Sequence, residues 1–201
     1  MEREGVPILF APAMNGAMHN KILTSSLKTL QKMGAIIIPP DQNHGKNKLA
    51  SLEILVAATI RALNFSSLSE KSIIITGGST PVPLDNIRYI TSRFTGELSI
   101  EIAREAWLMG AEVNLILGRG SKSGPEYLNT KVVDTFDEYR KEVLSLIQKK
   151  HFDWGIFSAA AADFEPESVF NGKFSSKVSK LTLELFPTKK LIDEVRKKFP
   201  H

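Results

Sequence analysis

The chain has 201 residues, of which 42% are hydrophobic and 24% are charged, so the composition excludes intrinsic disorder and indicates one or two folded domains. The formal net charge is +4 at pH 7, which favours anionic ligands. Because Lys and Arg are scattered and no basic stripe carries interleaved aromatic residues, we do not expect a nucleic-acid-binding protein.

Cysteine is absent, which excludes disulfides, thiolate metal sites and cysteine nucleophiles. No apolar run approaches the roughly 20 residues that cross a bilayer. No signal peptide precedes the first apolar segment. The sequence therefore predicts a cytoplasmic protein without membrane partners.

Apolar segments in the first third of the chain predict two short buried strands at 6–11 and 35–40. Helical spacing predicts a helix at 25–33 and a second one that Ser51 caps. The Ser-rich segment 64–70 is typical of a linker. We therefore expect two domains, 1–65 and 70–201.

In the second domain, strands alternate with amphipathic helices. The expected strands are 72–76, 112–117, 132–133 and 154–158, and the expected helices are 96–109, 137–149, started by Asp137, and 189–198, capped by Thr188. This alternation predicts an α/β fold, a Rossmann-like parallel sheet with helices on both faces. Ligands of such folds bind at the carboxyl ends of the strands.

Glycines follow the expected strand 72–76 directly, in the order Gly77-Gly78-Ser79-Thr80. Glycine lets backbone N–H groups approach an anion, and hydroxyls add donors. Gly96 opens the next helix, whose N-terminus favours phosphate, and Arg88 and Arg93 precede it with positive charge. A strand-ending turn without a ligand and solvent-facing arginines would have the same pattern.

Four alanines follow the strand 154–158, and Asp163 ends the run. Small side chains at Ala159 and Ala160 would let a flat ring lie against backbone, and Asp163 would meet a ribose hydroxyl or a magnesium ion. Tight packing and a helix cap are the alternatives. Lys173 and Lys177 lie in a Gly/Ser-rich stretch, typical of either a mobile flap or a solvated loop.

Three motifs together resemble one family. Ile75–Gly118 resembles the signature region of phosphopantothenate–cysteine ligase, Ser158–Pro166 resembles its Ala-Ala-x-x-Asp-Phe segment, and Lys173–Lys177 resembles its lysine flap. The resemblance covers residues 70–201. It implies the ligase half of the bifunctional phosphopantothenoylcysteine decarboxylase/phosphopantothenate–cysteine ligase family, with part of the decarboxylase half before it.

The resemblance implies that CTP activates 4′-phosphopantothenate as an acyl-cytidylate, which cysteine then attacks, with Mg2+ present and the chain a homodimer. The implied CTP-binding residues are Gly77, Gly78, Ser79, Gly96, Ala159, Ala160, Asp163, Lys173 and Lys177. Asp163 is also the implied metal ligand, and Arg88 and Arg93 the substrate-binding residues. The implied catalytic residues are Lys173 and Ser92, where Ser92 stands in the place of the family's usual Asn.

The segment Ala11–Ile22 resembles the Pro-Ala-Met-Asn motif of the flavin-dependent decarboxylase, a flavodoxin-like domain in which the residue matching Asn15 contacts substrate. Only the last third of that half is matched. We therefore expect no decarboxylase activity from this chain alone, and FMN only if a partner completes the domain.

Two readings stay open. One is an active CTP-dependent ligase, and the other is a truncated, non-catalytic or partner-dependent CTP-binding remnant of the bifunctional enzyme. A nicotinamide-dependent oxidoreductase is disfavoured, because no GxGxxG follows the expected strand 72–76.

Overall fold

The structure is a computed structural model that describes residues 5–14, 18, 20–41, 48–64 and 66–198. It divides into two compact units. The first comprises Met1–Ser69 with Leu108–Gly110, and the second comprises Glu70–Trp107 with Ala111–His201.

The first unit contains a parallel pair of two-residue strands, β1 (Leu9–Phe10) and β2 (Ile36–Ile37), and two helices, α1 (Lys21–Lys32) and α2 (Leu52–Leu63). Helix α1 begins earlier than predicted, because the Asn20 side chain accepts the Leu23 N–H and caps it. Ser51 caps α2 as predicted, accepting the Ile54 N–H at 3.3 Å. Asn15 lies outside the described residues.

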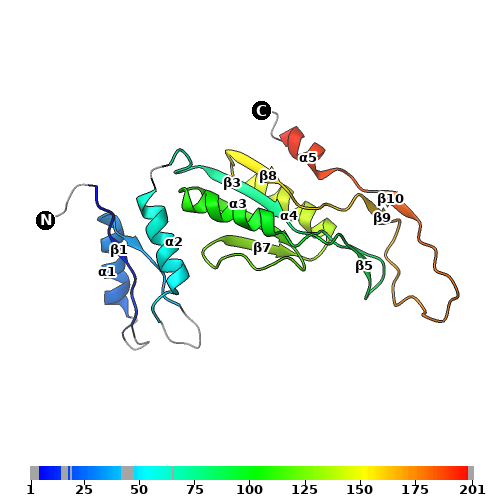
Figure 1. Cartoon of the computed structure of the whole chain (residues 1–201), viewed down its shortest axis with the longest axis horizontal. Coiled ribbons are helices and arrows are strands. Elements are labelled where there is room, and N and C mark those ends of the chain that lie inside the picture. The colour runs from blue at the N-terminus through cyan, green and yellow to red at the C-terminus, as the bar shows by residue number, and fades with distance from the viewer. Residues whose placement is uncertain (1–4, 15–17, 19, 42–47, 65, 199–201) are drawn as a thin grey trace. The chain divides into compact units, whose positions relative to one another are not determined.

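The second unit is built on a four-stranded, all-parallel sheet in the order β7-β6-β3-β8 (Figure 1). Its strands are β3 (Ser72–Gly77), β6 (Glu112–Gly118), β7 (Asn129–Val133) and β8 (Trp154–Phe157). Because β3 lies between β6 and β8, its carboxyl end meets theirs at one edge of the sheet. The predicted α/β, Rossmann-like fold is confirmed.

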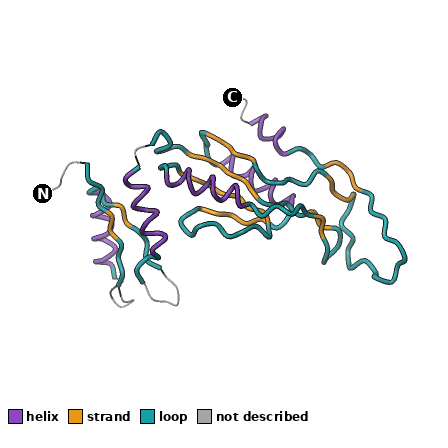
Figure 2. Tube along the Cα trace, viewed as in Figure 1, coloured by secondary structure: helices purple, strands orange, loops and turns teal. Residues whose placement is uncertain are grey.

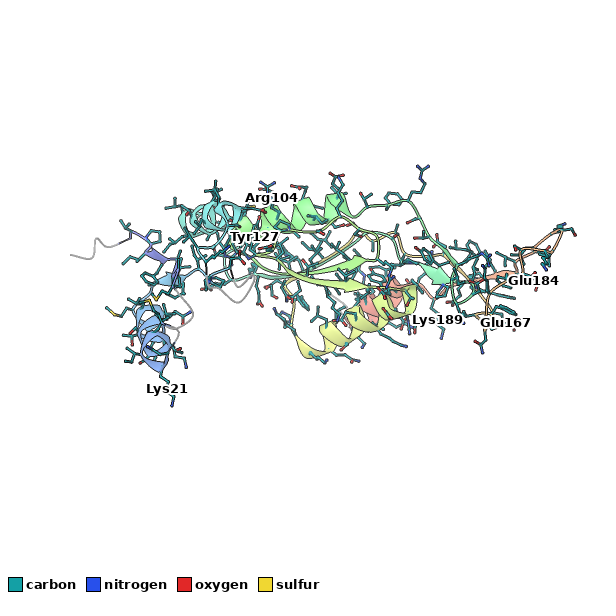
Figure 3. All side chains as sticks on the ribbon, turned by 90° about the horizontal axis from the view of Figure 1, so that it is seen from below. Lys21, Arg104, Tyr127, Glu167, Glu184 and Lys189 are labelled. Atoms are coloured by element: carbon teal, nitrogen blue, oxygen red, sulfur yellow. The ribbon has the colours of Figure 1, made fainter. Side chains whose placement is uncertain are left out.

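Helices cover both faces of this sheet. Helix α3 (Glu97–Leu108) lies on one face, whereas α4 (Phe136–Lys149) and α5 (Leu191–Lys198) lie on the other, as Figure 3 shows with Arg104 on α3 and Lys189 before α5. The core of the α4 face contains Ile74 and Ile116 of the sheet with Val143 of α4 and Val195 of α5. Since neighbouring strand residues point to opposite faces, Ile75 and Leu115, both at most 1% exposed, lie toward α3.

Two predicted helix starts are wrong. Thr135 caps α4, where its hydroxyl accepts the Glu138 N–H at 3.2 Å, and Asp137 lies in the first turn. Thr188 does not cap α5, which begins at Leu191. The Thr188 hydroxyl instead donates to the Ala162 carbonyl at 2.6 Å, because the chain before α5 runs beside the alanine segment.

Two short antiparallel pairs were not predicted. Strands β4 (Val82–Pro83) and β5 (Tyr89–Ile90) form one, and β9 (Phe164–Pro166) and β10 (Leu185–Pro187) form the other. A long loop joins β9 to β10 (Figure 2), and Glu167 and Glu184 lie at its two ends (Figure 3). Strands of two or three residues, three of which also contain proline, carry too little periodicity to be recognised from sequence.

Within the described residues, none of the helices is both long and apolar enough to cross a membrane.

Candidate functional site

The turn after β3 is packed so closely that only glycine fits there. A Cβ atom on Gly77 would overlap the Ser99 side chain of α3, and one on Gly118 would overlap the Ser79 carbonyl oxygen. Gly78 has a φ of +75°, a left-handed conformation that favours glycine, and a Cβ there would overlap the Ser121 hydroxyl. The predicted turn therefore exists, and it needs glycines because Ser99 and Ser121 pack directly against its backbone.

The turn is joined to the alanine segment by backbone hydrogen bonds. The Ala160 N–H donates to the Gly78 carbonyl at 2.8 Å, and Ser79 and Ala160 form a parallel bridge. One step further, the Ala162 N–H donates to the Thr80 hydroxyl at 2.9 Å. The structure thus brings the two clearest sequence motifs into contact at the carboxyl ends of β3 and β8.

The start of α3 lies against the same turn. Gly96 has a φ of +73°, and a Cβ atom on it would lie 3.1 Å from the Gly78 nitrogen and 3.1 Å from the Ser121 hydroxyl. Its carbonyl accepts the Ile100 N–H at 3.0 Å, a first bond of the helix. The N-terminal, partially positive end of α3 therefore adjoins the glycine turn.

Below the turn, hydroxyl groups form a network that the sequence did not reveal. Tyr139 donates its buried hydroxyl to Thr76 Oγ1 at 3.0 Å, and Ser158 Oγ donates to the Thr76 carbonyl at 2.9 Å. Ser99 Oγ and Ser158 Oγ are 3.0 Å apart. Burial raises the pKa of Tyr139 above its ordinary value, against the opposing hydrogen bond to Thr76. The network ties α3, β3, β8 and α4 together and fixes the turn.

A pocket of about 280 Å³ opens beside the alanine segment, between it and the chain entering α5. Ala159, Ala162 and Asp163 line one wall, and the segment 188–192 lines the other. Asp163 is exposed and forms an ion pair with Lys190. Sequence reasoning missed Lys190, because nothing in the local pattern indicates that residues 27 positions apart meet.

Among the described residues, Asp163 is not joined by further protein ligands that could hold the predicted magnesium ion. Among the residues that the structure describes, no three His, Cys, Asp or Glu side chains gather closely enough to hold a metal ion. The Asp163 carboxylate is paired with Lys190, so a metal would have to displace that ammonium group. These residues do not fit a protein-held ion, and magnesium stays a prediction.

Ser92 and Arg93 lie in the segment between β5 and α3. The Ser92 hydroxyl is buried and has no hydrogen-bond partner among the described residues. Such an atom has unmet hydrogen-bonding capacity, which a ligand can satisfy. Arg93 is exposed.

A buried carboxylate, Asp85, organises the loop after β4. Its side chain is fully buried and its Oδ1 accepts the N–H groups of Ile87 at 2.8 Å and Arg88 at 2.6 Å. Its Oδ2 accepts the Arg88 guanidinium at 2.7 Å and the Phe174 N–H at 3.0 Å. Burial opposes ionisation, but these donors outweigh it and hold the pKa of Asp85 well below its usual range.

The loop after β4 contains the predicted Arg88 and is hydrogen-bonded to Phe174, where the predicted lysine flap begins. Arg88 also donates to the Phe174 carbonyl at 3.3 Å, and its side chain is 39% exposed. Lys173, next to Phe174, is exposed, and Lys177 is exposed three residues after that anchor. Sequence reasoning missed Asp85, although an Asp two and three residues before its N–H partners is a turn signal.

Comparison with known proteins assigns this architecture to a family. The DNA/pantothenate metabolism flavoprotein C-terminal domain family matches residues 68–201. The coenzyme A biosynthesis bifunctional protein CoaBC of Thermococcus kodakarensis is 37% identical over 96% of this chain and 48% of its own length. Its counterpart in Borreliella burgdorferi is 31% identical over 94% of this chain and 50% of its own length.

The chain thus spans about half the length of the curated relatives it matches. Among solved structures, the C-terminal domain of a CoaBC protein aligns with a TM-score of 0.55 and 28% identity, covering 65% of this chain and 60% of that one. The family match covers the whole of the second unit, which contains the glycine turn, the alanine segment and Lys173. The chain belongs to the DNA/pantothenate metabolism flavoprotein C-terminal domain family.

Proposed function

We propose that this chain acts in coenzyme A biosynthesis, where it binds CTP and ligates cysteine to 4′-phosphopantothenate. The observation that carries the proposal is the backbone junction of the glycine turn with Ala160, beside the helix start at Gly96. Motifs that resemble those of the ligase are thereby gathered at one edge of a parallel sheet, where such folds bind ligands. Relatives named for coenzyme A biosynthesis support the pathway.

The geometry suits a nucleoside triphosphate. The glycine turn and the N-terminal end of α3 offer backbone N–H groups and a positive dipole end to phosphates. The pocket of about 280 Å³ has the small side chains of Ala159 and Ala162 along one wall, which suits a pyrimidine ring. Asp163 at the rim accepts hydroxyl hydrogens of a ribose, and Lys190 and Lys189 add positive charge there.

The proposed chemistry has two steps. A carboxylate oxygen of phosphopantothenate attacks the α-phosphorus of CTP, the bond to the β-phosphate oxygen breaks, and pyrophosphate leaves. The cysteine amine then attacks the acyl carbon, so that an amide forms, CMP leaves and the amine gives up one proton. Mg2+ accompanies the triphosphate in this proposal, and no step depends on a protein-bound metal.

Within this scheme, Lys173 neutralises charge that develops on the leaving phosphates. The Ser92 hydroxyl is buried and unpartnered among the described residues, so it donates to the acyl-cytidylate only after the segment between β5 and α3 has moved to expose it. Arg88, whose side chain is 39% exposed, and Arg93 bind the phosphate of phosphopantothenate. The ligase resemblance also implies a homodimer, which light scattering after gel filtration would test.

A second candidate function is CTP binding that needs a partner chain for turnover. The serine at position 92 favours it, because one hydroxyl offers fewer hydrogen bonds than the amide of the family's usual Asn.

The test is pyrophosphate release by the purified chain with CTP, Mg2+, 4′-phosphopantothenate and cysteine, with ATP and cysteine-free controls. CTP-specific release that requires phosphopantothenate supports the ligase. Lys173→Ala should lower its rate by about 100-fold, as loss of one charge-stabilising group does, whereas the matched Lys180→Ala, at an exposed lysine with no assigned role, should lower it far less. If no pyrophosphate is released but CTP still raises the melting temperature, the second candidate is favoured. If CTP causes neither pyrophosphate release nor a rise in the melting temperature, both candidate functions are refuted.

A further inference from the structure

The strongest feature outside the nucleotide turn is a cluster that we call the Asp85 clamp, consisting of Asp85, Arg88 and the segment 170–174. It joins two stretches of chain that are 89 residues apart at their central bond, Phe174 N–H to Asp85 Oδ2. The first stretch follows the glycine turn through β4, and the second begins the lysine-bearing loop between β9 and β10. Burying a carboxylate costs free energy even when both of its oxygens accept hydrogen bonds, so this feature needs a role.

Backbone bonds on either side extend the clamp. The Phe170 N–H donates to the Leu84 carbonyl at 3.0 Å, and the Asn86 N–H donates to the Gly172 carbonyl at 3.0 Å. The rings of Phe170 and Phe174 stack with centroids 4.7 Å apart. The segment is therefore held at both ends, and Lys173 lies inside it while Lys177 lies outside.

The clamp also fixes Arg88. One guanidinium nitrogen, Nη1, contacts both Asp85 Oδ2 and the Phe174 carbonyl, at 2.7 Å and 3.3 Å. With that nitrogen engaged, the planar guanidinium keeps a fixed orientation. One carboxylate thus fixes the Arg88 guanidinium and the backbone segment that carries Lys173.

We propose that Asp85 is a positioning residue, which holds Arg88 and the Lys173-bearing segment in one arrangement before the anionic substrates bind. The clamp itself rests on geometry alone, whereas the use of Arg88 and Lys173 rests on the proposed function. Preorganised charges cost less rearrangement when charge develops in a reaction. Asp85 itself is too buried to touch substrate.

The test variant is Asp85→Asn, which is nearly isosteric. Its amide oxygen can still accept the Ile87 and Arg88 N–H groups, but its amide nitrogen would face two donors, Phe174 N–H and the Arg88 guanidinium. The turn should persist while the clamp opens. The control is Asp137→Asn, which removes an exposed carboxylate paired with Lys141 on α4.

Limited trypsin digestion reads the clamp directly. We expect Asp85→Asn to speed cleavage after Lys173 by roughly ten-fold or more, the effect of losing a hydrogen bond to a charged group. Cleavage after Lys177 should change little, and Asp137→Asn should change neither. Equal cleavage after Lys173 in the wild type and Asp85→Asn would overturn the proposal.

If Asp85→Asn unfolds and trypsin cuts it throughout, hydrogen exchange of the wild-type chain tests whether the clamp exists. A Phe174 amide that is protected relative to the amides of 175–180 supports the clamp, and an unprotected one overturns it. In the pyrophosphate assay, Asp85→Asn should lower kcat because Lys173 is no longer held in place, and it should raise KM for phosphopantothenate because Arg88 is no longer held in place.

Unchanged kcat and KM with an opened clamp would overturn the positioning role. A wild-type chain without turnover would refute only the proposed ligase, because the digestion still reads the clamp.

Discussion

Replacing Gly77 by alanine tests how closely β3 approaches α3. The added Cβ would overlap both Cβ and Oγ of Ser99 and would lie 3.3 Å from Leu117 Cδ2. Because Ser99 Cβ is bonded to the helix backbone, no side-chain rotation relieves the overlap, and α3 would have to move. Overpacking of this kind typically costs 1–3 kcal/mol, and we expect about 3 kcal/mol here.

Urea unfolding followed by circular dichroism measures this cost, which corresponds to a fall in melting temperature of about 6–12 °C for a chain of this size. Gly124→Ala is the matched control, since its Cβ would meet only ordinary contacts of 3.6 Å and longer. Adding Ser99→Gly to Gly77→Ala removes both overlapping atoms and should recover about 1–2 kcal/mol as a coupling energy. A cost for Gly77→Ala no larger than that for Gly124→Ala would refute the close approach of β3 and α3.

Three further predictions concern stability. Burial raises the pKa of Tyr139, so the free energy that its neutral hydroxyl contributes to folding is fully present below the ordinary pKa of 10.0 and is lost at higher pH. In urea titrations at increasing pH, Tyr139→Phe should therefore lose less stability than the wild type. Hydrogen bonds from Arg140 lower the pKa of Glu194, so the free energy that this pair contributes to folding is fully present above the ordinary pKa of 4.5 and is lost as the pH falls. Glu194→Gln should therefore lose less stability on acidification than the wild type. An equal loss would contradict the pairing. Thr135→Ala should cost about 1 kcal/mol by removing the cap of α4, and a neutral effect would show that another residue starts the helix.

Most of the second unit was predictable because its strands are long or apolar enough to be distinctive. The segment Ile73–Ile75 is almost fully buried, and the glycines that follow it mark the strand end by composition alone. The contact of the glycine turn with the alanine segment follows from parallel strands ending at one edge. These local and topological rules account for the nucleotide turn.

The remaining parts of the site depend on contacts that no local pattern contains. Asp163 pairs with Lys190, and Asp85 accepts from Phe174, because the loops between strands fold back over the sheet edge. The cap of α4 was misassigned because Thr135 and Asp137 are both acceptable cap residues and only the backbone decides between them. Sequence reasoning therefore reached the strand ends but not the loops that complete the site.

The strand order β7-β6-β3-β8 also sets when the turn can form during folding. Strand β6 is the first partner of β3 along the chain. The Gly78 carbonyl and the Thr80 hydroxyl, however, accept N–H groups from Ala160 and Ala162, which follow β8 and lie 82 positions further along. Contacts of such sequence separation slow folding, because a long loop must close before they are rewarded. On a ribosome, the nucleotide turn would therefore stay incomplete until β8 and the alanine segment had emerged.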